Sequence, residues 1–198
     1  MMGQIPIFPL GTILFPYGRI PLQIFEPRYV DLVKNSLKTN TDFGVVFITQ
    51  GSEVAAPVTA AIPKMISTGC MARIVDWNAL PNNKFEIVIE GQTLFNCDGF
   101  SMAKDNLIST MGSKVEREQN ISVPEQYIEH GEVLLSLLDH PAWARLNFDV
   151  DINDAYKLSM QLAQVMPIDE LNKLGLLECD SSMQRLAIID DLLDELSG

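Results

Sequence analysis

Side chains that could carry acid–base, nucleophilic or metal chemistry are few and far apart in this sequence. Two histidines, His130 and His140, are the side chains whose ordinary pKa suits proton transfer near neutral pH. The three cysteines, Cys70, Cys97 and Cys179, are scattered and form no CxxC pair, which argues against zinc and a disulfide framework. No P-loop, GxGxxG or Gly-x-Ser-x-Gly pattern occurs. The sequence therefore predicts no catalytic set, no metal site and no cofactor.

Both histidines are expected to have structural roles. His130 falls on the polar side of a predicted helix, beside Glu129. His140 precedes Pro141 at the end of that helix, where an imidazolium would complement the helix dipole. The spacing suggests no neighbouring nucleophile and no carboxylate that would orient either ring. A surface or capping role is therefore favoured over catalysis.

A cluster of polar residues after Phe148 resembles the start of a calcium loop. With Asp149 as the first ligand, the sixth position must be glycine and the twelfth glutamate. Those positions hold Asp154 and Met160, so both requirements fail. The cluster instead predicts capping of the following helix by Asp151 or Asn153.

Short apolar runs bounded by turn residues dominate residues 1–116 and predict strands. The expected strands are Ile5–Phe8, Pro21–Phe25, Phe43–Thr49, Cys70–Trp77, Phe85–Phe95 and Leu107–Val115. One helix is expected to begin at Glu26-Pro27 and to carry apolar residues at helical spacing up to Leu37. Strands this short and closely spaced predict an antiparallel barrel or sandwich.

From about residue 117 onward the apolar residues recur with the period of a helix. Four helices are expected: from Pro124 to Pro141, from Asn153 to Pro167, from Asp169 to Leu174 before Gly175, and from Asp180 to Leu196. The polar segment Gly112–Asn120 is either a linker or the start of the first of them. The chain is thus expected to be α+β, with a β domain at 1–116 and an acidic helical bundle at 117–198.

Charge is divided unevenly between these two parts. Residues 1–115 hold nine basic and nine acidic side chains, whereas residues 116–198 hold five basic and seventeen acidic ones, which accounts for the net charge of −12. Such a surface repels nucleic-acid phosphate and anionic lipid. The N-terminal residues lack a basic n-region, and prolines interrupt their apolar run. We therefore expect a soluble cytoplasmic protein.

The first 29 residues resemble the opening signature of the Lon protease N-terminal domain family. The resemblance is carried, in order, by Ile5–Leu10, Leu14–Pro16 and Pro21–Tyr29. Weaker similarities follow at Phe43–Val46, Gly69–Ile74, Glu90-Gly91, Leu158-Ser159, Leu162-Ala163, Met166-Pro167 and Leu176–Glu178. One departure is Gln92–Phe95, because the family has an arginine and an aromatic residue there.

This resemblance implies a PUA-like antiparallel β-barrel with one helix, followed by a C-terminal helical bundle. It further implies a non-catalytic module that binds proteins or unfolded and extended peptide segments, and possible association with components of the Lon system. The ATPase and Ser-Lys protease modules of full-length Lon are absent from the 198 residues, so no enzymatic activity is expected. RNA binding stays open as an alternative, because PUA-like barrels elsewhere bind RNA, although the net charge opposes it.

The family-signature residues are Phe15, Glu26, Arg28 and Tyr29, and the last three match the signature best. An arginine beside a helix start can pair with a carboxylate or cap carbonyl groups, and Tyr29 can pack inward. A structural role is therefore favoured over ligand binding for this set.

Overall fold

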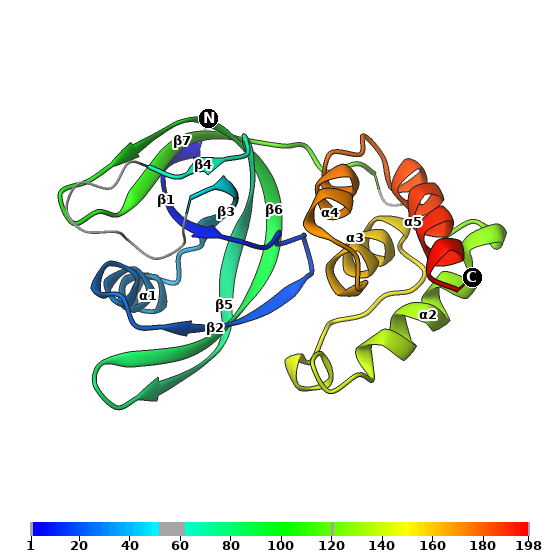
Figure 1. Ribbon diagram of the computed structural model, residues 1–198, viewed down its shortest axis with the longest axis horizontal. Coiled ribbons are helices and arrows are strands. Elements are labelled where there is room, and N and C mark those ends of the chain that lie inside the picture. The colour runs from blue at the N-terminus through cyan, green and yellow to red at the C-terminus, as the bar shows by residue number, and fades with distance from the viewer. Residues whose placement is uncertain (1, 52–61, 120, 198) are drawn as a thin grey trace. The chain divides into compact units, whose positions relative to one another are not determined.

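The computed structural model describes residues 2–51, 62–119 and 121–197. It divides into two compact units. The β unit comprises Met1–Leu14 and Arg19–Glu116, and the helical unit comprises Phe15–Gly18 and Arg117–Gly198 (Figure 1). The chain thus contributes four early residues to the helical unit before it returns to the β unit.

The β unit contains seven strands and one helix among its described residues. Their bounds are β1 Met2–Leu10, β2 Arg19–Ile24, α1 Pro27–Thr39, β3 Phe43–Gln50, β4 Lys64–Met65, β5 Thr68–Leu80, β6 Lys84–Met102 and β7 Ile108–Lys114. Every strand expected from the sequence is present, and β4 is additional. The first predicted helix is confirmed as α1, with Pro27 at its first turn and Asn40 in the left-handed conformation at its end.

The strands form one mostly antiparallel sheet in the order β1-β7-β6-β5-β3-β4, with β2 paired to β6 (Figure 1). One pairing departs from the expected antiparallel barrel. β1 and β3 run parallel, with Ile7 opposite Gly44 and Leu10 opposite Phe47. Parallel neighbours need a long crossover connection, and β2 and α1 supply it. The sheet is therefore not a clean antiparallel barrel.

β6 is longer than the sequence predicted, because it continues past Phe95 to Met102, and its pairing is irregular at several points. The register with β5 shifts opposite Gly91, where a bend was expected. The register with β7 shifts near Gly99, whose φ of 70° favours glycine. Phe95 itself is fully buried, and a Cβ at Gly69 would lie 2.5 Å from its Cζ atom. Glycine at 69 therefore makes room for the ring that fills the centre of the β unit.

The helical unit contains four α-helices and two short 3-10 helices among its described residues. They are η1 Glu125–Tyr127, α2 Glu129–Leu138, η2 Ala144–Leu146, α3 Ala155–Val165, α4 Glu170–Leu177 and α5 Ser182–Ser197. α3 contacts α2, α4 and α5, and all of its residues are buried. Residues 115–119 form no regular structure, so this part of the expected linker is not helical; Asn120 lies outside the described residues.

Several helix boundaries differ from expectation. The helix expected from Pro124 to Pro141 is divided into η1 and α2, and α2 ends at Leu138. Asp154 caps α3, since its side chain accepts a hydrogen bond from the amide of Lys157, whereas Asp151 accepts one from Asn153. Capping by Asp151 or Asn153 was therefore wrong, because the helix begins one residue later. Gly175 does not end the third helix either, because α4 continues through it to Leu177.

Candidate functional site

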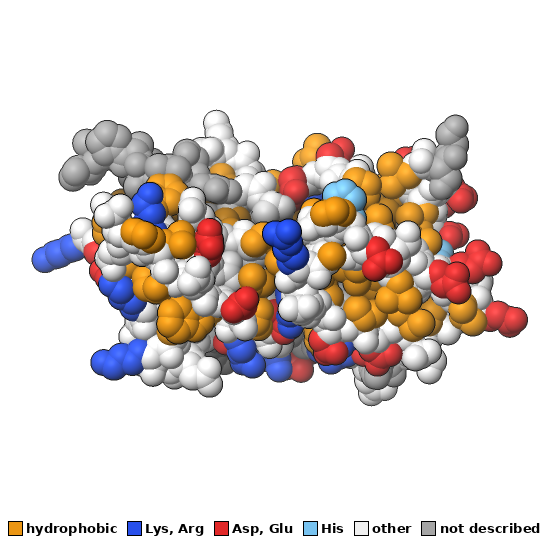
Figure 2. Space-filling view, turned by 90° about the horizontal axis from the view of Figure 1, so that it is seen from below, with side chains coloured by type: hydrophobic (Ala, Val, Ile, Leu, Met, Phe, Trp, Pro, Cys, Tyr) orange, Lys and Arg blue, Asp and Glu red, His pale blue; other side chains and the backbone are white. Residues whose placement is uncertain are grey.

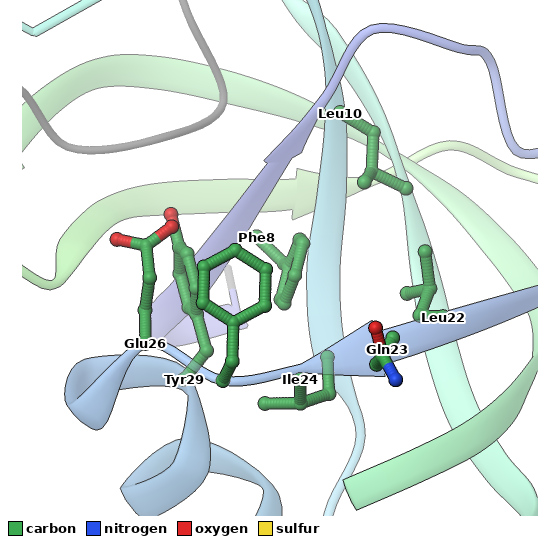
Figure 3. Close-up of a pocket in the computed structure, with 8 residues that line it drawn as sticks. Phe8, Leu10, Leu22, Gln23, Ile24, Glu26 and Tyr29 are labelled. Carbon is green, nitrogen blue, oxygen red and sulfur yellow. The ribbon is translucent and has the colours of Figure 1, made fainter. Parts of the chain in front are cut away.

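A pocket of about 120 Å³ lies where β1, β2 and the start of α1 meet in the β unit (Figure 3). Its lining is mainly apolar and comprises Phe8, Leu10, Leu22, Gln23, Ile24, Phe25, Glu26 and Tyr29. Figure 3 shows Phe8 and Leu10 on one side and Leu22 and Ile24 on the other. The pocket thus brings together side chains from two strands and a helix start.

Both strands at the pocket have an edge that the described ladders leave open. β1 pairs with β7 only as far as Ile7, and Phe8–Leu10 continue along β3 alone. β2 pairs only with β6. Pro21 lies in β2 and has no N–H group to donate, which suits an edge strand. The pocket is therefore bordered by polypeptide backbone as well as by apolar side chains.

Three of the four signature residues meet beside this pocket. The guanidinium of Arg28 lies 3.1 Å from the Glu26 carboxylate and donates a hydrogen bond of 2.9 Å to the carbonyl oxygen of Asn106. It also lies 4.3 Å from the centre of the Tyr29 ring. Tyr29 in turn stacks on Phe8, with 4.1 Å between ring centroids. Glu26 and Tyr29 line the pocket, and Arg28 holds both of them.

Phe25 is the pocket residue that sequence reasoning missed. It was expected only as the last residue of a strand, yet its side chain is 51% exposed, while its neighbour Ile24 is buried. Its place directly before the Glu26-Pro27 helix start was the available signal. The half-exposed ring of Phe25 thus adds accessible apolar area at the pocket.

Phe15 does not join the other signature residues. It is fully buried and belongs to the helical unit. Its amide donates a hydrogen bond of 3.0 Å to Oε1 of Gln164 on α3. Phe15 therefore fixes the early chain segment to α3 and offers no surface for a ligand.

Comparison with known proteins identifies the family. The model of the ATP-dependent protease La (LON) substrate-binding domain matches residues 4–195. This chain belongs to the Lon substrate-binding domain family. No curated protein matches it.

Two solved structures share the Lon N-terminal fold with this chain. A Lon N-terminal domain protein from Xanthomonas campestris is 24% identical, with a TM-score of 0.71 and 98% of each chain covered. The N-terminal domain of a Mycobacterium avium complex Lon protease is 14% identical, with a TM-score of 0.61, and 95% of this chain and 96% of that chain are covered. At these identities the likeness supports the Lon fold and not a shared ligand.

Most basic side chains of the helical unit of this Lon-family chain are engaged by acidic or polar groups of the same unit. Arg117 donates to the Asp154 carboxylate at 2.9 Å and to the Tyr17 hydroxyl at 2.6 Å. Its guanidinium also lies 4.9 Å from the centre of the Tyr156 ring. Lys157 pairs with Asp149 at 2.7 Å. These contacts explain why the Asp149–Asp154 cluster is a structural and capping element.

Arg185 is buried almost completely at the centre of the helical unit. It donates to the carbonyl oxygens of Leu176 and Cys179 and to the hydroxyl of Ser159. Burial lowers the pKa of Arg185, which the nearby Cys179 and Tyr156 partly offset. Arg185 thus ties α5 to α3 and to the end of α4.

His130 is buried, which corrects the expectation of a surface position. Its Nε2 atom lies 3.2 Å from a carboxylate oxygen of Asp190 on α5, and its ring meets that of Tyr127 edge-on. Burial lowers the pKa of His130, and the charges of Asp190 and Glu129 act against that shift. The period of α2 alone could not reveal this contact with α5. His140 is exposed, and its Nδ1 atom accepts a hydrogen bond from the amide of Ala142.

Burial disfavours the thiolate form of all three cysteines of this Lon-family chain. Burial raises the pKa of Cys70 strongly and that of Cys97 to about 11, and it also raises that of Cys179. A thiol with a raised pKa is a poor nucleophile. Within the described residues, no group of three His, Cys, Asp or Glu side chains could hold a metal ion. In the same residues, no helix is long and apolar enough to cross a membrane.

Proposed function

We propose that this chain is a non-catalytic protein-binding module that holds an apolar side chain of a protein, or of an unfolded or extended segment, in the β-unit pocket. One observation carries the proposal: the half-exposed Phe25 stands at an apolar pocket bordered by the open edges of β1 and β2. The family to which the chain belongs is named for substrate binding, which supports this reading.

The dimensions of the pocket favour a single side chain as its occupant. Apolar cavities of about 150 Å³ accept a benzene-sized group, and this pocket measures about 120 Å³. Glu26 is already paired with Arg28, so recognition depends on shape and apolar character more than on charge. Pro21 cannot donate to an added strand, so backbone pairing along β2 would extend over Leu22–Ile24 at most.

Within this proposal the four signature residues have structural roles. Arg28 clamps Glu26 and Tyr29 into the pocket wall, and Tyr29 supports Phe8 beneath it. Phe15 anchors the residues before β2 to the helical unit. The residues that would touch a bound segment are then Leu22 and Phe25.

We further propose that residues 1–116 are a PUA-like β domain and that 117–198 are an acidic helical bundle that takes in Phe15–Gly18. The division into two compact units supports the assignment. The proposed partners are proteins, including components of the Lon system. The free thiols Cys70, Cys97 and Cys179 favour a reducing compartment such as the cytoplasm.

Binding of a permanently unfolded protein tests the proposed function. Fluorescently labelled, carboxymethylated α-lactalbumin serves as the probe, and its anisotropy is followed as the full chain is titrated. Phe25→Ser should weaken binding by about fivefold or more, as expected for a central apolar contact. Trp77→Ser is the matched control, because Trp77 is 53% exposed in the same unit and does not line the pocket.

Three results would count against this reading. The first is that the wild-type chain does not bind the unfolded probe. The second is that Phe25→Ser and Trp77→Ser lose equal amounts of affinity for it. The third is that a single-stranded RNA binds more tightly than the probe and in a salt-dependent way. The last would favour the RNA-binding alternative.

A further inference from the structure

An alternating stripe of acidic and apolar side chains begins in η1 and continues along α2. The stripe comprises Glu125, Ile128, Glu132, Leu135 and Asp139, spaced three and four residues apart. From Ile128, which has helical φ and ψ, to Asp139 that spacing places neighbours on one side of the helix, and Glu125 lies in η1 just before it. All five residues are exposed, with Ile128 at 59% and Leu135 at 46%.

The stripe is widened by an isoleucine from outside the helix. Gly131 lies between Ile128 and Leu135 in the helix, and a Cβ there would be 3.0 Å from Cβ of Ile152. Ile152 therefore sits directly on the backbone of α2 at Gly131, with part of its side chain exposed. We call Ile128, Gly131, Leu135 and Ile152 the α2 patch. Figure 2 shows hydrophobic side chains gathered on this face of the helical unit, with acidic side chains around them.

No ion pair within the described residues neutralises the acids around the α2 patch. Residues 118–144 contain no lysine or arginine. None of the ion pairs in the described residues involves Glu125, Glu132 or Asp139. Most basic side chains of the unit are engaged elsewhere: Arg117 with Asp154, Lys157 with Asp149, Lys173 with Glu170 and Arg185 with main-chain carbonyls. The stripe therefore presents unneutralised negative charge interleaved with apolar area.

We propose that the α2 patch and its acidic stripe dock a basic amphipathic helix of another protein. Apolar side chains of that helix would cover Ile128, Leu135 and Ile152, and its lysines or arginines would pair with Glu125, Glu132 and Asp139. The site lies in the helical unit and is separate from the β-unit pocket, so it adds a second binding surface to the proposed function.

Charge decides between this occupant and the others that an apolar patch could take. A second copy of the chain would bring one acidic stripe against another, and like charges across an interface oppose association. Nucleic acid and anionic membranes carry the same sign as the stripe. A basic helix supplies both the apolar spacing and the opposite charge.

A pair of designed peptides tests the proposal on the full chain. The first is an amphipathic helix of about 18 residues with alternating lysine and leucine at three- and four-residue spacing; the second has glutamate in place of lysine. Anisotropy of the labelled peptides is measured at about 50 mM and about 300 mM salt. The lysine peptide should bind and weaken with salt, and the glutamate peptide should not bind.

Variants locate the binding on the chain. Ile128→Ser with Leu135→Ser should weaken binding of the lysine peptide about tenfold, and Glu132→Gln about threefold. Leu171→Ser on α4 and Asp191→Asn on α5 are matched controls, because both side chains are exposed elsewhere in the same unit, and each should change binding less than about twofold. Both residues changed at the patch are exposed, so the fold should persist, and circular dichroism checks it.

Equal losses in the control variants would overturn the proposal, because they would reveal general attraction to an acidic protein. Unchanged binding in the Ile128/Leu135 variant would overturn it as well. Sedimentation that shows a dimer in the wild type and a monomer in that variant would mean that a second copy covers the patch instead.

Discussion

The amide of Phe15 donates a hydrogen bond to Oε1 of Gln164, across 149 residues of sequence. Both residues are buried, Gln164 within a helix that is buried over its whole length. Gln161, one turn earlier on α3, donates to the carbonyl oxygens of Tyr17 and Asp149. Two glutamines of α3 thus hold the Phe15–Gly18 segment in the helical unit.

Gly18 is expected to be intolerant of any side chain, because a Cβ there would collide with the side-chain amide of Gln164. Gly18→Ala should lower the free energy of unfolding by about 1–3 kcal/mol, the usual cost of overpacking. Gln164→Ala should cost about 1–3 kcal/mol, because it leaves the Phe15 amide buried without its acceptor. Urea denaturation measures both.

The double variant separates this contact from a general effect of the two changes. With Ala at 164 the collision is gone, so adding Gly18→Ala should cost clearly less than it does in the wild type. Additive losses would show that Gly18 and Gln164 are not coupled.

Arg28→Lys is expected to destabilise the β unit although it keeps the charge. Lysine cannot reproduce the planar contacts of Arg28 with Glu26, with the Asn106 carbonyl and with the Tyr29 ring. The free energy of unfolding should fall by about 1–2 kcal/mol in urea denaturation.

Arg73→Lys provides the matched control for this change. Arg73 also forms a two-point contact with a carboxylate, that of Asp42, but its side chain is exposed. Its replacement should cost less than about 0.5 kcal/mol. Equal losses at the two positions would mean that the burial of Arg28 contributes nothing.

Most helices and strands were predicted correctly, because each depends on the spacing of apolar, turn and capping residues that are close together in the sequence. The apolar run Phe43–Thr49 and the Glu26-Pro27 helix start both lie where expected. The parallel pairing of β1 with β3 was not predicted, since the apolar pattern of a strand does not say which distant strand it pairs with or in which direction. Gln161 and Gln164 of α3 are polar, so their residue type alone would place them on the surface. Their burial is explained only by their hydrogen-bond partners, which are distant in sequence.

The candidate site was predictable only in part for the same reason. The family signature pointed to Glu26, Arg28 and Tyr29, which meet beside the pocket. The signature also pointed to Phe15, but Phe15 belongs to the helical unit and does not line the pocket. Phe25 was missed, because its place directly before the predicted helix start does not by itself reveal that its side chain is exposed.

Gly175→Ala is expected to stabilise the protein. Gly175 lies inside α4, it is exposed, and no atom lies within 4 Å of a Cβ built there. Alanine costs less conformational entropy in a helix, so the free energy of unfolding should rise by about 0.5–1 kcal/mol. Gly131→Ala in α2 is the comparison, and it should gain less because its Cβ would lie 3.0 Å from that of Ile152. Thermal and urea denaturation measure the stability of both variants. If α4 frays before Gly175, the gain from Gly131→Ala would exceed the gain from Gly175→Ala.

Acidification is expected to destabilise the helical unit through His130. Burial lowers the pKa of His130 below its ordinary value of 6.5 in the folded state, against the opposing charges of Asp190 and Glu129. Near and below pH 6.5 the unfolded chain therefore binds this proton more readily than the folded chain does. The free energy of unfolding decreases as the pH is lowered from 6.5, and it levels off once the pH is below the folded-state pKa.

Urea midpoints at about pH 7.5 and about pH 5.5 measure this loss, and His130→Gln should reduce it relative to the wild type. His140→Gln is the control, since His140 is exposed at the end of α2. An NMR titration of the His130 ring gives the direct result, which should show a midpoint below 6.5. A midpoint above that value would mean that the attraction to Asp190 outweighs burial, and stability would then increase on acidification.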